Sequence, residues 1–182
     1  MVIHYSLHYE QTGIIFITGG KWTTYREMAE DVINKVIETH GFESKAGPCK
    51  TEHIQLRGGV GYNRNVPIQL VQEFGIAQQS AEHLARSYGM HAFEVCRSAS
   101  STSKTSLSKC GNLVIDGYPY LECEIEYACK HEMACTVADY LTLRTRLAYL
   151  DSQAAFLAAS KVTDLMGKAL RWTEKEKKET AR

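Results

Sequence analysis

The sequence predicts a mainly α-helical protein, in which a bundle of about six helices follows one short strand–turn–helix segment. Three features indicate this. Apolar residues recur at steps of three and four through most segments after residue 65. Residues 13–18 form the one clear β-like run, with four consecutive apolar side chains, three of them isoleucines. Gly19 and Gly20 then end that run.

The composition is typical of a globular protein and excludes several functions. Of the 182 residues, 44% are apolar. Lys plus Arg and Asp plus Glu both number 21, so the formal net charge is zero. This balance gives no electrostatic footprint for nucleic acid and no polybasic signal for an anionic membrane. No apolar run reaches the roughly 18 residues that a spanning helix needs, and residues 1–10 resemble neither a signal peptide nor a transit peptide.

The N-terminal segment predicts a strand and a helix. Residues 2–6 are also strand-like, and residues 22–40 show a helical apolar stripe that ends at Gly41. Thr23 or Thr24 is expected to cap the helix start, with Glu27 at the capping-box distance from Thr24. Because one strand cannot form a sheet alone, we expect this chain to be a piece of a longer protein.

The later helices follow from periodicity and from the residues at their ends. Asn65 and Pro67 mark one start, and Thr136 is expected to cap another. The glycine-rich run at 58–61 does not match a dinucleotide fingerprint and is interpreted as a turn. Residues 98–112 are interpreted as an exposed loop, and the charged tail at 173–182 as a solvated or frayed end. The predicted helices cover about 66–74, 80–88, 91–98, 121–131, 136–143 and 151–170.

The cysteines and histidines predict no metal site. None of the six cysteines belongs to a Cys-x-x-Cys pair, so we expect free, mostly buried thiols in a reducing compartment. Cys129, His131 and Cys135 come nearest to the spacing of a zinc site, and buried thiols remain the preferred interpretation. The seven histidines share no metal-like spacing and are expected at surface or capping positions. Arg144 and Arg146 are expected to pair with Asp139 and Asp151 and so to hold helices together.

The segment at 18–26 carries the most chemistry. A strand ends in two glycines, which let another molecule approach the backbone, and a helix begins at once. A helix start presents unpaired N–H groups and the positive end of the dipole, and Lys21 adds a full charge there. Such a point suits a phosphate, a carboxylate or a reduced flavin ring. The alternative is a plain turn in which Gly19 and Gly20 only make a tight corner.

Residues 19–31, Gly-Gly-Lys-Trp-Thr-Thr-Tyr-Arg-x-Met-Ala-Glu-Asp, resemble the signature that opens the C-terminal region of FAD-dependent glycerol-3-phosphate dehydrogenases. The segment is also similar to the related α-glycerophosphate oxidases, and the likeness is strongest to the mitochondrial type. It runs from about residue 13 to 172 in consistent order and spacing. The further segments that carry it are His83-Leu84, Tyr88-Gly89, Glu126-Tyr127-Ala128, Ala134-Cys135-Thr136, Arg144 to Asp151, Leu165-Met166-Gly167 and Trp172.

The resemblance implies that Gly19, Gly20, Lys21, Trp22 and Thr23 face FAD. It gives Lys21 an electrostatic role, either toward the reduced flavin or toward the substrate phosphate. It also implies three parts: a terminal strand of the FAD and substrate domain at 1–20, a helical domain at 21–172 and the tail.

The activity implied is oxidation of sn-glycerol 3-phosphate to dihydroxyacetone phosphate, with electrons passed through FAD to a quinone, at the mitochondrial inner membrane as a peripheral protein. The Gly-rich FAD fingerprint of the family is absent from this sequence, and no arginine precedes Arg26. Most FAD contacts and the catalytic base are therefore expected in an N-terminal FAD domain, and the chain alone is expected to be inactive. The alternatives are a non-catalytic helical interaction module and an oxidase that uses oxygen.

Overall fold

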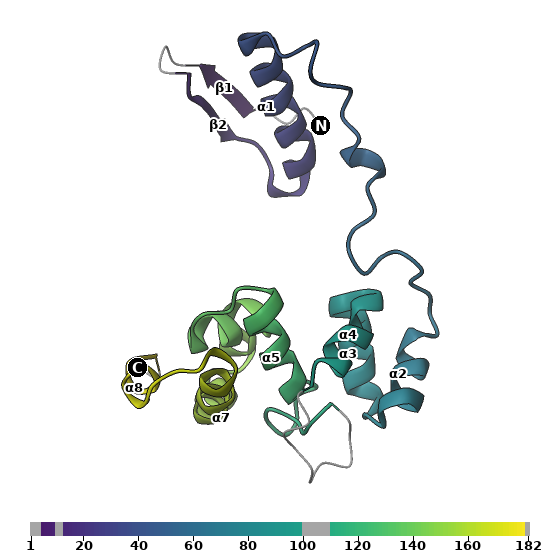
Figure 1. The fold of residues 1–182 in the computed structure, drawn as a ribbon, viewed down its shortest axis with the longest axis vertical. Helices are drawn as coiled ribbons and strands as arrows, with labels where there is room; N and C mark the ends of the chain where they lie inside the picture. The colour runs from purple at the N-terminus through teal and green to yellow at the C-terminus, as the bar shows by residue number, and fades with distance from the viewer. Residues whose placement is uncertain (1–4, 10–12, 100–109, 181–182) are drawn as a thin grey trace. The chain divides into compact units, whose positions relative to one another are not determined.

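The computed structural model describes residues 5–9, 13–99 and 110–180. The chain forms two compact units, Met1–Gln55 and Leu56–Arg182 (Figure 1). The boundaries expected at residues 20 and 172 remain a prediction. Within the described parts of the chain, no helix has the length and apolar character needed to cross a bilayer.

The first unit is a two-stranded hairpin with one helix beside it (Figure 1). Strand β1 (Tyr5–Tyr9) pairs antiparallel with β2 (Ile15–Gly19), so that Tyr5 lies opposite Gly19. A 3₁₀ turn, η1 (Trp22–Thr24), leads into helix α1 (Tyr25–His40), which contacts β2. The predicted strand and helix are confirmed, and the strand-like start of the chain supplies the partner strand from residue 5 onward. Residues 2–4 of that prediction lie outside the described residues.

This first unit has little core of its own. Ile15 and Ile17 are half-buried, whereas Phe16 between them is 46% exposed, which is the alternation of a one-sided sheet. Helix α1 contains no buried residue, and Ile33 on it is 57% exposed. A two-stranded hairpin is only marginally stable in water unless further apolar surface covers it. The unit therefore presents apolar surface that its own described residues do not cover.

In the described residues of the second unit, the regular elements are helices, apart from an isolated antiparallel bridge between Leu113 and Leu121. Its helices confirm the predicted mainly α fold and lie close to the predicted ranges. Part of the predicted loop, residues 100–109, falls outside the described residues. The helices are α2 (Val66–Phe74), α3 (Gln78–Tyr88), α4 (Ala92–Arg97), α5 (Glu122–His131), a π-helical turn η4 (Asp139–Arg144), α6 (Leu147–Leu150), α7 (Ser152–Leu170) and α8 (Glu174–Thr180).

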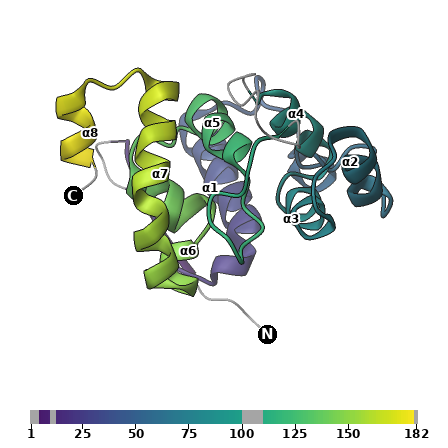
Figure 2. The same ribbon diagram turned by 90° about the horizontal axis from the view of Figure 1, so that it is seen from below.

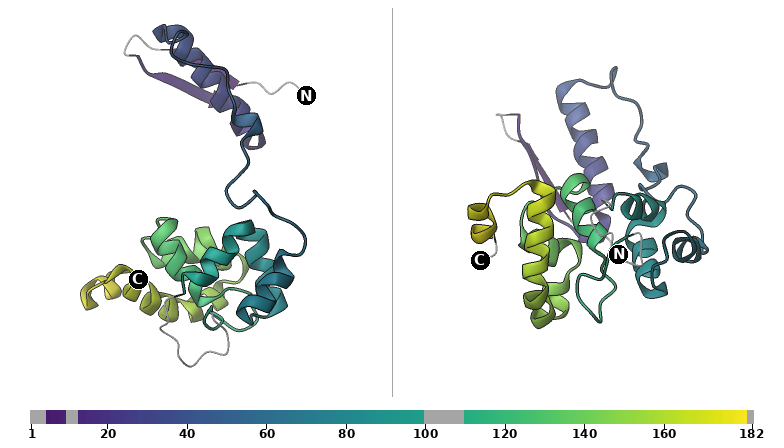
Figure 3. Two further views of the ribbon diagram at one scale, coloured as in Figure 1. Left: turned by 45° about the vertical axis from the view of Figure 1, so that its right-hand side comes forward. Right: turned by 60° about the horizontal axis from the view of Figure 1, so that its bottom comes forward.

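Helix α5 joins two apolar clusters. It contributes Cys123 to a cluster formed mainly by α2, α3 and α4, with Leu70 and Leu84 fully buried. It contributes Ile125 to a second cluster with η4, α6 and α7, in which Met166 is fully buried. Figures 1 and 2 both place α5 between α4 and α7, and the right-hand view of Figure 3 gives the same order.

The glycine-rich run is a turn, as predicted, and it is held against the end of α3. Gly58 O accepts a hydrogen bond from Met90 N at 2.8 Å. A Cβ atom at Gly58 would lie 2.2 Å from Tyr88 O, and one at Gly89 would lie 2.3 Å from Gly58 O. Both glycines have positive φ, +81° and +58°. Two backbones therefore touch at a point where neither residue has room for a side chain.

Two predicted caps are wrong, and two helices, α6 and α8, were not predicted. The starts at Lys21 and Thr24 have no side-chain cap, and Asn65 does not cap α2 with its side chain. The predicted Thr136 cap is confirmed by Asp139 N, 3.1 Å from Thr136 Oγ1. The tail forms helix α8 rather than a frayed end.

A capping box stabilises the start of α8. Glu176 Oε2 accepts from Thr173 N at 2.7 Å, and Thr173 Oγ1 accepts from Glu176 N at 3.3 Å. Both orphan donors of the first turn are thereby satisfied reciprocally.

Candidate functional site

The turn between β2 and η1 exposes a short stretch of backbone. Gly19 and Gly20 have φ of +85° and +88°, conformations that glycine adopts at little cost. Lys21 is extended, with φ −125° and ψ 135°, and starts the 3₁₀ turn. The five predicted site residues, 19–23, are consecutive and all exposed. The turn needs both glycines for its shape, and it also leaves the backbone accessible.

The helical start at this turn retains unpaired donors. Thr24 N and Thr24 Oγ1 both donate to Lys21 O, at 2.9 and 2.8 Å. No side chain among the described residues accepts from the first turn. The start of the 3₁₀ turn has no acidic residue in its own first turn, and Lys21 adds a positive charge at the same place. The combination favours a negatively charged or electron-rich group.

A cavity of about 510 Å³ lies beside this turn. That volume is within the usual range of roughly 300 to 1,000 Å³ for small-molecule sites. Its wall is mostly apolar, and two exposed aromatic rings belong to it, Trp22 at 91% and Tyr25 at 66% exposure. Four of the five predicted residues line it, whereas Thr23 does not. The lining comprises Ile17, Gly19, Gly20, Lys21, Trp22, Tyr25, Met28, Ala29, Val32 and Ile33.

This arrangement suits a flat, largely apolar group with one polar or anionic edge. The apolar side chains of α1 form a surface against which a ring can pack, and Lys21 with the helical start lies at one rim. Preorganised donors of this kind stabilise charge that develops next to them during a reaction. The same cavity also suits an apolar segment of a neighbouring polypeptide.

A second polar cluster lies inside the helical unit. Glu124 is 2% exposed, and its Oε2 accepts hydrogen bonds from His83 Nε2 at 2.7 Å and Tyr88 OH at 3.3 Å. Its Oε1 accepts from Leu121 N at 2.7 Å. Burial, followed by the nearby Glu124 charge, raises the pKa of Tyr88 well above its usual range. The prediction of a surface or capping position is wrong for His83, which joins α3 to α5.

Comparison with known proteins identifies the family. The family model of the C-terminal domain of alpha-glycerophosphate oxidase matches residues 49–177, well over half of the chain. The chain belongs to this family.

Full-length relatives also match the part of the chain that precedes residue 49. The chain is 45% identical over 169 residues to "Glycerol-3-phosphate dehydrogenase, mitochondrial" of Macaca fascicularis, covering 93% of this chain and 23% of that protein. The human protein of the same name is 44% identical with the same coverage. "Probable glycerol-3-phosphate dehydrogenase, mitochondrial" of Dictyostelium discoideum is 38% identical over 175 residues, 96% of this chain and 26% of that protein. The chain thus spans about a quarter of the length of these curated relatives, and the predicted resemblance is confirmed.

The candidate site lies outside the family model but inside the alignment with relatives. The family model begins at residue 49, after the turn at 19–23. The alignment with the Macaca fascicularis protein covers 169 of the 182 residues, which leaves too few for that turn to fall outside it. The site therefore belongs to the segment that these relatives share with the chain, upstream of the α-glycerophosphate oxidase C-terminal domain itself.

Arg144, Asp139 and Asp151 have structural roles, as predicted, but their partners differ from the predicted ones. Arg144 pairs with Glu132, with Nε and Oε2 3.6 Å apart, and not with an aspartate as predicted. Asp139 accepts from Thr136 N at 2.8 Å. Asp151 caps α7 by accepting from Ala154 N at 2.9 Å and also accepts from Tyr118 OH at 2.9 Å. Each acid therefore secures a helix start rather than an anion site.

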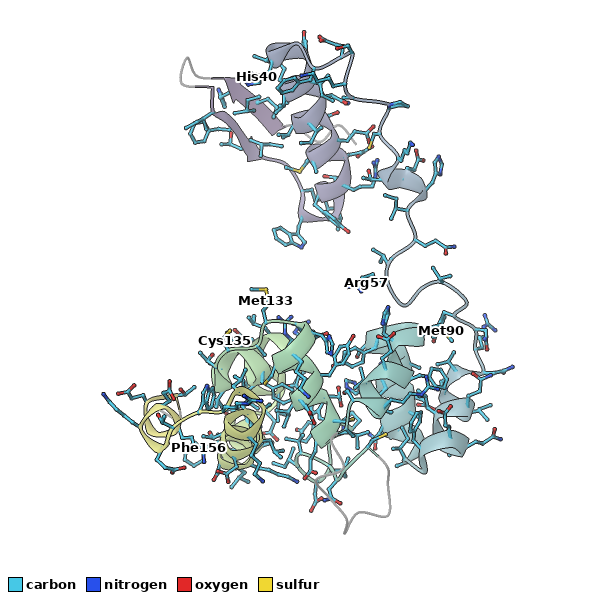
Figure 4. All side chains as sticks on the ribbon, viewed as in Figure 1. His40, Arg57, Met90, Met133, Cys135 and Phe156 are labelled. Carbon is cyan, nitrogen blue, oxygen red and sulfur yellow. The ribbon has the colours of Figure 1, made fainter. Side chains whose placement is uncertain are left out.

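All six cysteines are free, as predicted, but only Cys96, Cys110 and Cys123 are buried. Among the described residues, Cys129, His131 and Cys135 do not converge on one point. Cys135 is exposed beside Met133 in the connection after α5, as Figure 4 shows. The structure instead brings Cys96, Cys110 and Cys123 together in the core. Their separations of 14 and 13 residues match no local ligand motif, so only the three-dimensional packing reveals the cluster.

Proposed function

We propose that the chain is the C-terminal part of a flavoenzyme that oxidises sn-glycerol 3-phosphate to dihydroxyacetone phosphate and passes the electrons through FAD to a quinone. Relatives over 93% of the chain are named glycerol-3-phosphate dehydrogenase, mitochondrial, which supports this activity and a mitochondrial location. In this proposal the intact enzyme is peripheral to the mitochondrial inner membrane. The chain supplies one edge of the flavin site.

The observation that carries the proposal is the cavity beside the Gly19–Gly20 turn. Its apolar wall fits the ring system of a flavin, and its rim fits the polar pyrimidine edge. Gly19 and Gly20 allow close approach to the backbone, while Lys21, Trp22 and Thr23 occupy the first positions of the helical start.

The chemistry that FAD supplies when bound is acceptance of a hydride from C2 of the substrate. The residues of this chain then have an electrostatic task. Lys21 and the η1 start stabilise the negative charge that develops beside them, without having to reorganise first. A contact between Lys21 and the substrate phosphate is the other assignment compatible with an ammonium group at this rim.

The remaining parts of the proposed active site lie elsewhere in the enzyme. This chain has no glycine-rich cradle for the FAD pyrophosphate, which normally contributes much of the affinity. The exposed apolar residues of the first unit, such as Phe16 and Ile33, are consistent with a partner domain that completes its sheet and core.

A second candidate function is assembly, favoured by exposed apolar side chains on α6 and α7. Leu150 at the end of α6 and Phe156 and Leu157 on α7 are 67%, 82% and 71% exposed. Large exposed apolar side chains are typical of interaction surfaces when they form a contiguous patch. An oxidase that passes electrons to oxygen is a further alternative, favoured by the description of the matching family model.

The proposal is tested in a chimera that carries this chain in place of the matching segment of the Macaca fascicularis relative. Lys21→Met should lower the rate of flavin reduction at saturating glycerol 3-phosphate by about 10² to 10³, as loss of a preorganised donor typically does. Lys50→Met, at another exposed lysine of the same unit, is the matched control and should leave the rate unchanged. The measurement is stopped-flow absorbance of the flavin. A Lys21→Met chimera that folds, binds FAD and reduces it at the control rate would remove Lys21 from the site.

A further inference from the structure

Three buried cysteines of the helical unit meet at one point. Cys96 lies on α4, Cys123 on α5 and Cys110 in the turn before the Leu113–Leu121 bridge. Their Sγ atoms all lie within 4.8 Å of one another, and the three residues are at most 2% exposed. Cys110 O accepts from Cys123 N at 3.3 Å, which fixes the turn against the helix. The proposed flavin site does not include these residues.

The spacing of the three sulfurs is that of metal ligands. Three thiolates that each bind one ion at about 2.3 Å in a plane lie about 4.0 Å apart, and two thiolates on opposite sides of the ion lie about 4.6 Å apart. All three sulfurs here lie within 4.8 Å of one another, which admits either arrangement. A disulfide needs a sulfur separation of about 2.05 Å and leaves the third thiol unused. The positions therefore suit a shared ion better than a disulfide.

The surroundings decide which kind of ion fits. No histidine or carboxylate among the described residues joins the three sulfurs. The nearby Glu124 carboxylate is already engaged by His83 and by Leu121 N. A zinc ion would lack the fourth ligand that its tetrahedral sites require. Soft thiolate ligands favour copper(I), zinc and iron–sulfur clusters, and of these copper(I) is the one that two or three sulfurs can hold without a fourth ligand.

We propose that Cys96, Cys110 and Cys123 form a binding site for a soft monovalent ion, copper(I). Binding replaces S–H bonds with copper–sulfur bonds and releases two or three protons to solvent, and no electron is transferred. A thiol must lose its proton to ligate a metal, so the copper–sulfur bonds themselves stabilise the thiolates in this buried site. A bound ion would link α4, the Cys110 turn and α5.

The test uses the 182-residue chain, kept reduced under anaerobic conditions and titrated with copper(I) held by the chromophoric chelator bicinchoninate. We expect transfer of one copper(I) per chain, a sulfur-only coordination shell in X-ray absorption, and a higher Tm in the presence of copper. Loss of a residue that only supports a metal ligand lowers metal affinity by up to roughly 100-fold. The variant Cys96→Ala/Cys110→Ala/Cys123→Ala removes the ligands themselves, so its affinity for copper(I) should fall by more than that. The matched control Cys49→Ala/Cys129→Ala/Cys135→Ala keeps the cluster and should bind as the wild type does.

Two further measurements keep the test independent of folding. Helical circular dichroism establishes that each variant is folded, and the single changes Cys96→Ala and Cys123→Ala replace the triple variant if it is not. The Tm and X-ray absorption of the wild-type chain require no variant. Failure of the wild type to take copper from the chelator would overturn the proposal. Nitrogen or oxygen ligands in the absorption spectrum, or equal binding by a folded cluster variant, would do the same.

Discussion

His83 Nε2 lies 2.7 Å from Glu124 Oε2, and this contact joins helix α3 to helix α5 across the interior of the helical unit. Both side chains are largely removed from water, with 18% and 2% of their surface exposed. An acid in this position needs its partners, because an unpaired buried carboxylate is costly.

Replacing the carboxylate should be far more harmful than replacing one at the surface. Glu124→Ala removes the acceptor for three donors and should lower the free energy of unfolding by about 3 to 5 kcal/mol. Glu73→Gln is the control, since it weakens the exposed pair with Arg97 and should cost no more than about 1 kcal/mol. Urea unfolding followed by helical circular dichroism measures both. Similar losses for the two variants would show that the buried cluster contributes no special stability.

The contact between Gly58 and Gly89 makes a steric prediction. Gly89→Ala places a Cβ atom 2.3 Å from Gly58 O, so backbone must move, and we expect a loss of at least about 2 kcal/mol. Gly61→Ala is the matched control in the same turn, with φ of +76° and nothing within 4 Å of the added atom. It should cost only the left-handed strain of roughly 1 to 2 kcal/mol. Chemical denaturation compares the two; equal costs would mean that the backbone contact yields without penalty.

The Asp151 cap should make stability depend on pH in acid. The Ala154 N–H and then the Tyr118 hydroxyl hold the pKa of Asp151 below its ordinary value of 3.8. Because the folded pKa is depressed, the stabilisation is present above the unfolded value and is lost as the pH falls through the lower folded value. Asp151→Ala should therefore lower Tm by roughly 2 to 4 °C near neutral pH, and the difference should vanish in strong acid. Asp164→Ala, at an uncapped site on α7, should show no such convergence. Thermal scans from neutral pH to below pH 3 test this.

The isolated chain should retain FAD weakly. It supplies the proposed edge around Gly19–Thr23 but no cradle for the pyrophosphate. Gel filtration of the chain mixed with FAD should separate protein from flavin, as followed by absorbance of the flavin. Co-elution of one FAD per chain would contradict this prediction and would mean that the cavity beside α1 binds the cofactor without the rest of the enzyme.

Local sequence signals predicted the helices well where they agreed with the packing. Helix α2 has the bounds expected from Pro67 and Gly75, and α7 begins after Asp151, because turn residues and apolar periodicity favour the same ends. The caps at Thr24 and Asn65 failed because a polar residue near a helix start has other local partners, such as Lys21 O. The Thr173–Glu176 capping box can be recognised in the sequence, but the many charged residues of the tail favoured the interpretation as a frayed end.

The candidate site was only partly predictable. The Gly-Gly break and Lys21 were recognisable because they are consecutive, and the structure adds the apolar wall contributed by α1. The pairing of His83 with Glu124 spans 41 positions, and the cysteine cluster combines α4, a turn and α5. Contacts between residues so distant in sequence depend on how helices pack, and no local pattern encodes them.

Helix α5 has residues in both apolar clusters, and this gives the helical unit a mechanical property. Cys123 and Ile125 are two positions apart yet belong to different clusters, so the helix cannot shift for one without disturbing the other. Proteins normally open locally in contiguous cooperative units. Here helix α5 belongs to both apolar clusters, so the two clusters are expected to open together. Amide hydrogens of α2 and of α7 would then exchange with the same opening free energy. A destabilising substitution in one apolar cluster would thus also destabilise the other cluster, through a single helix of ten residues.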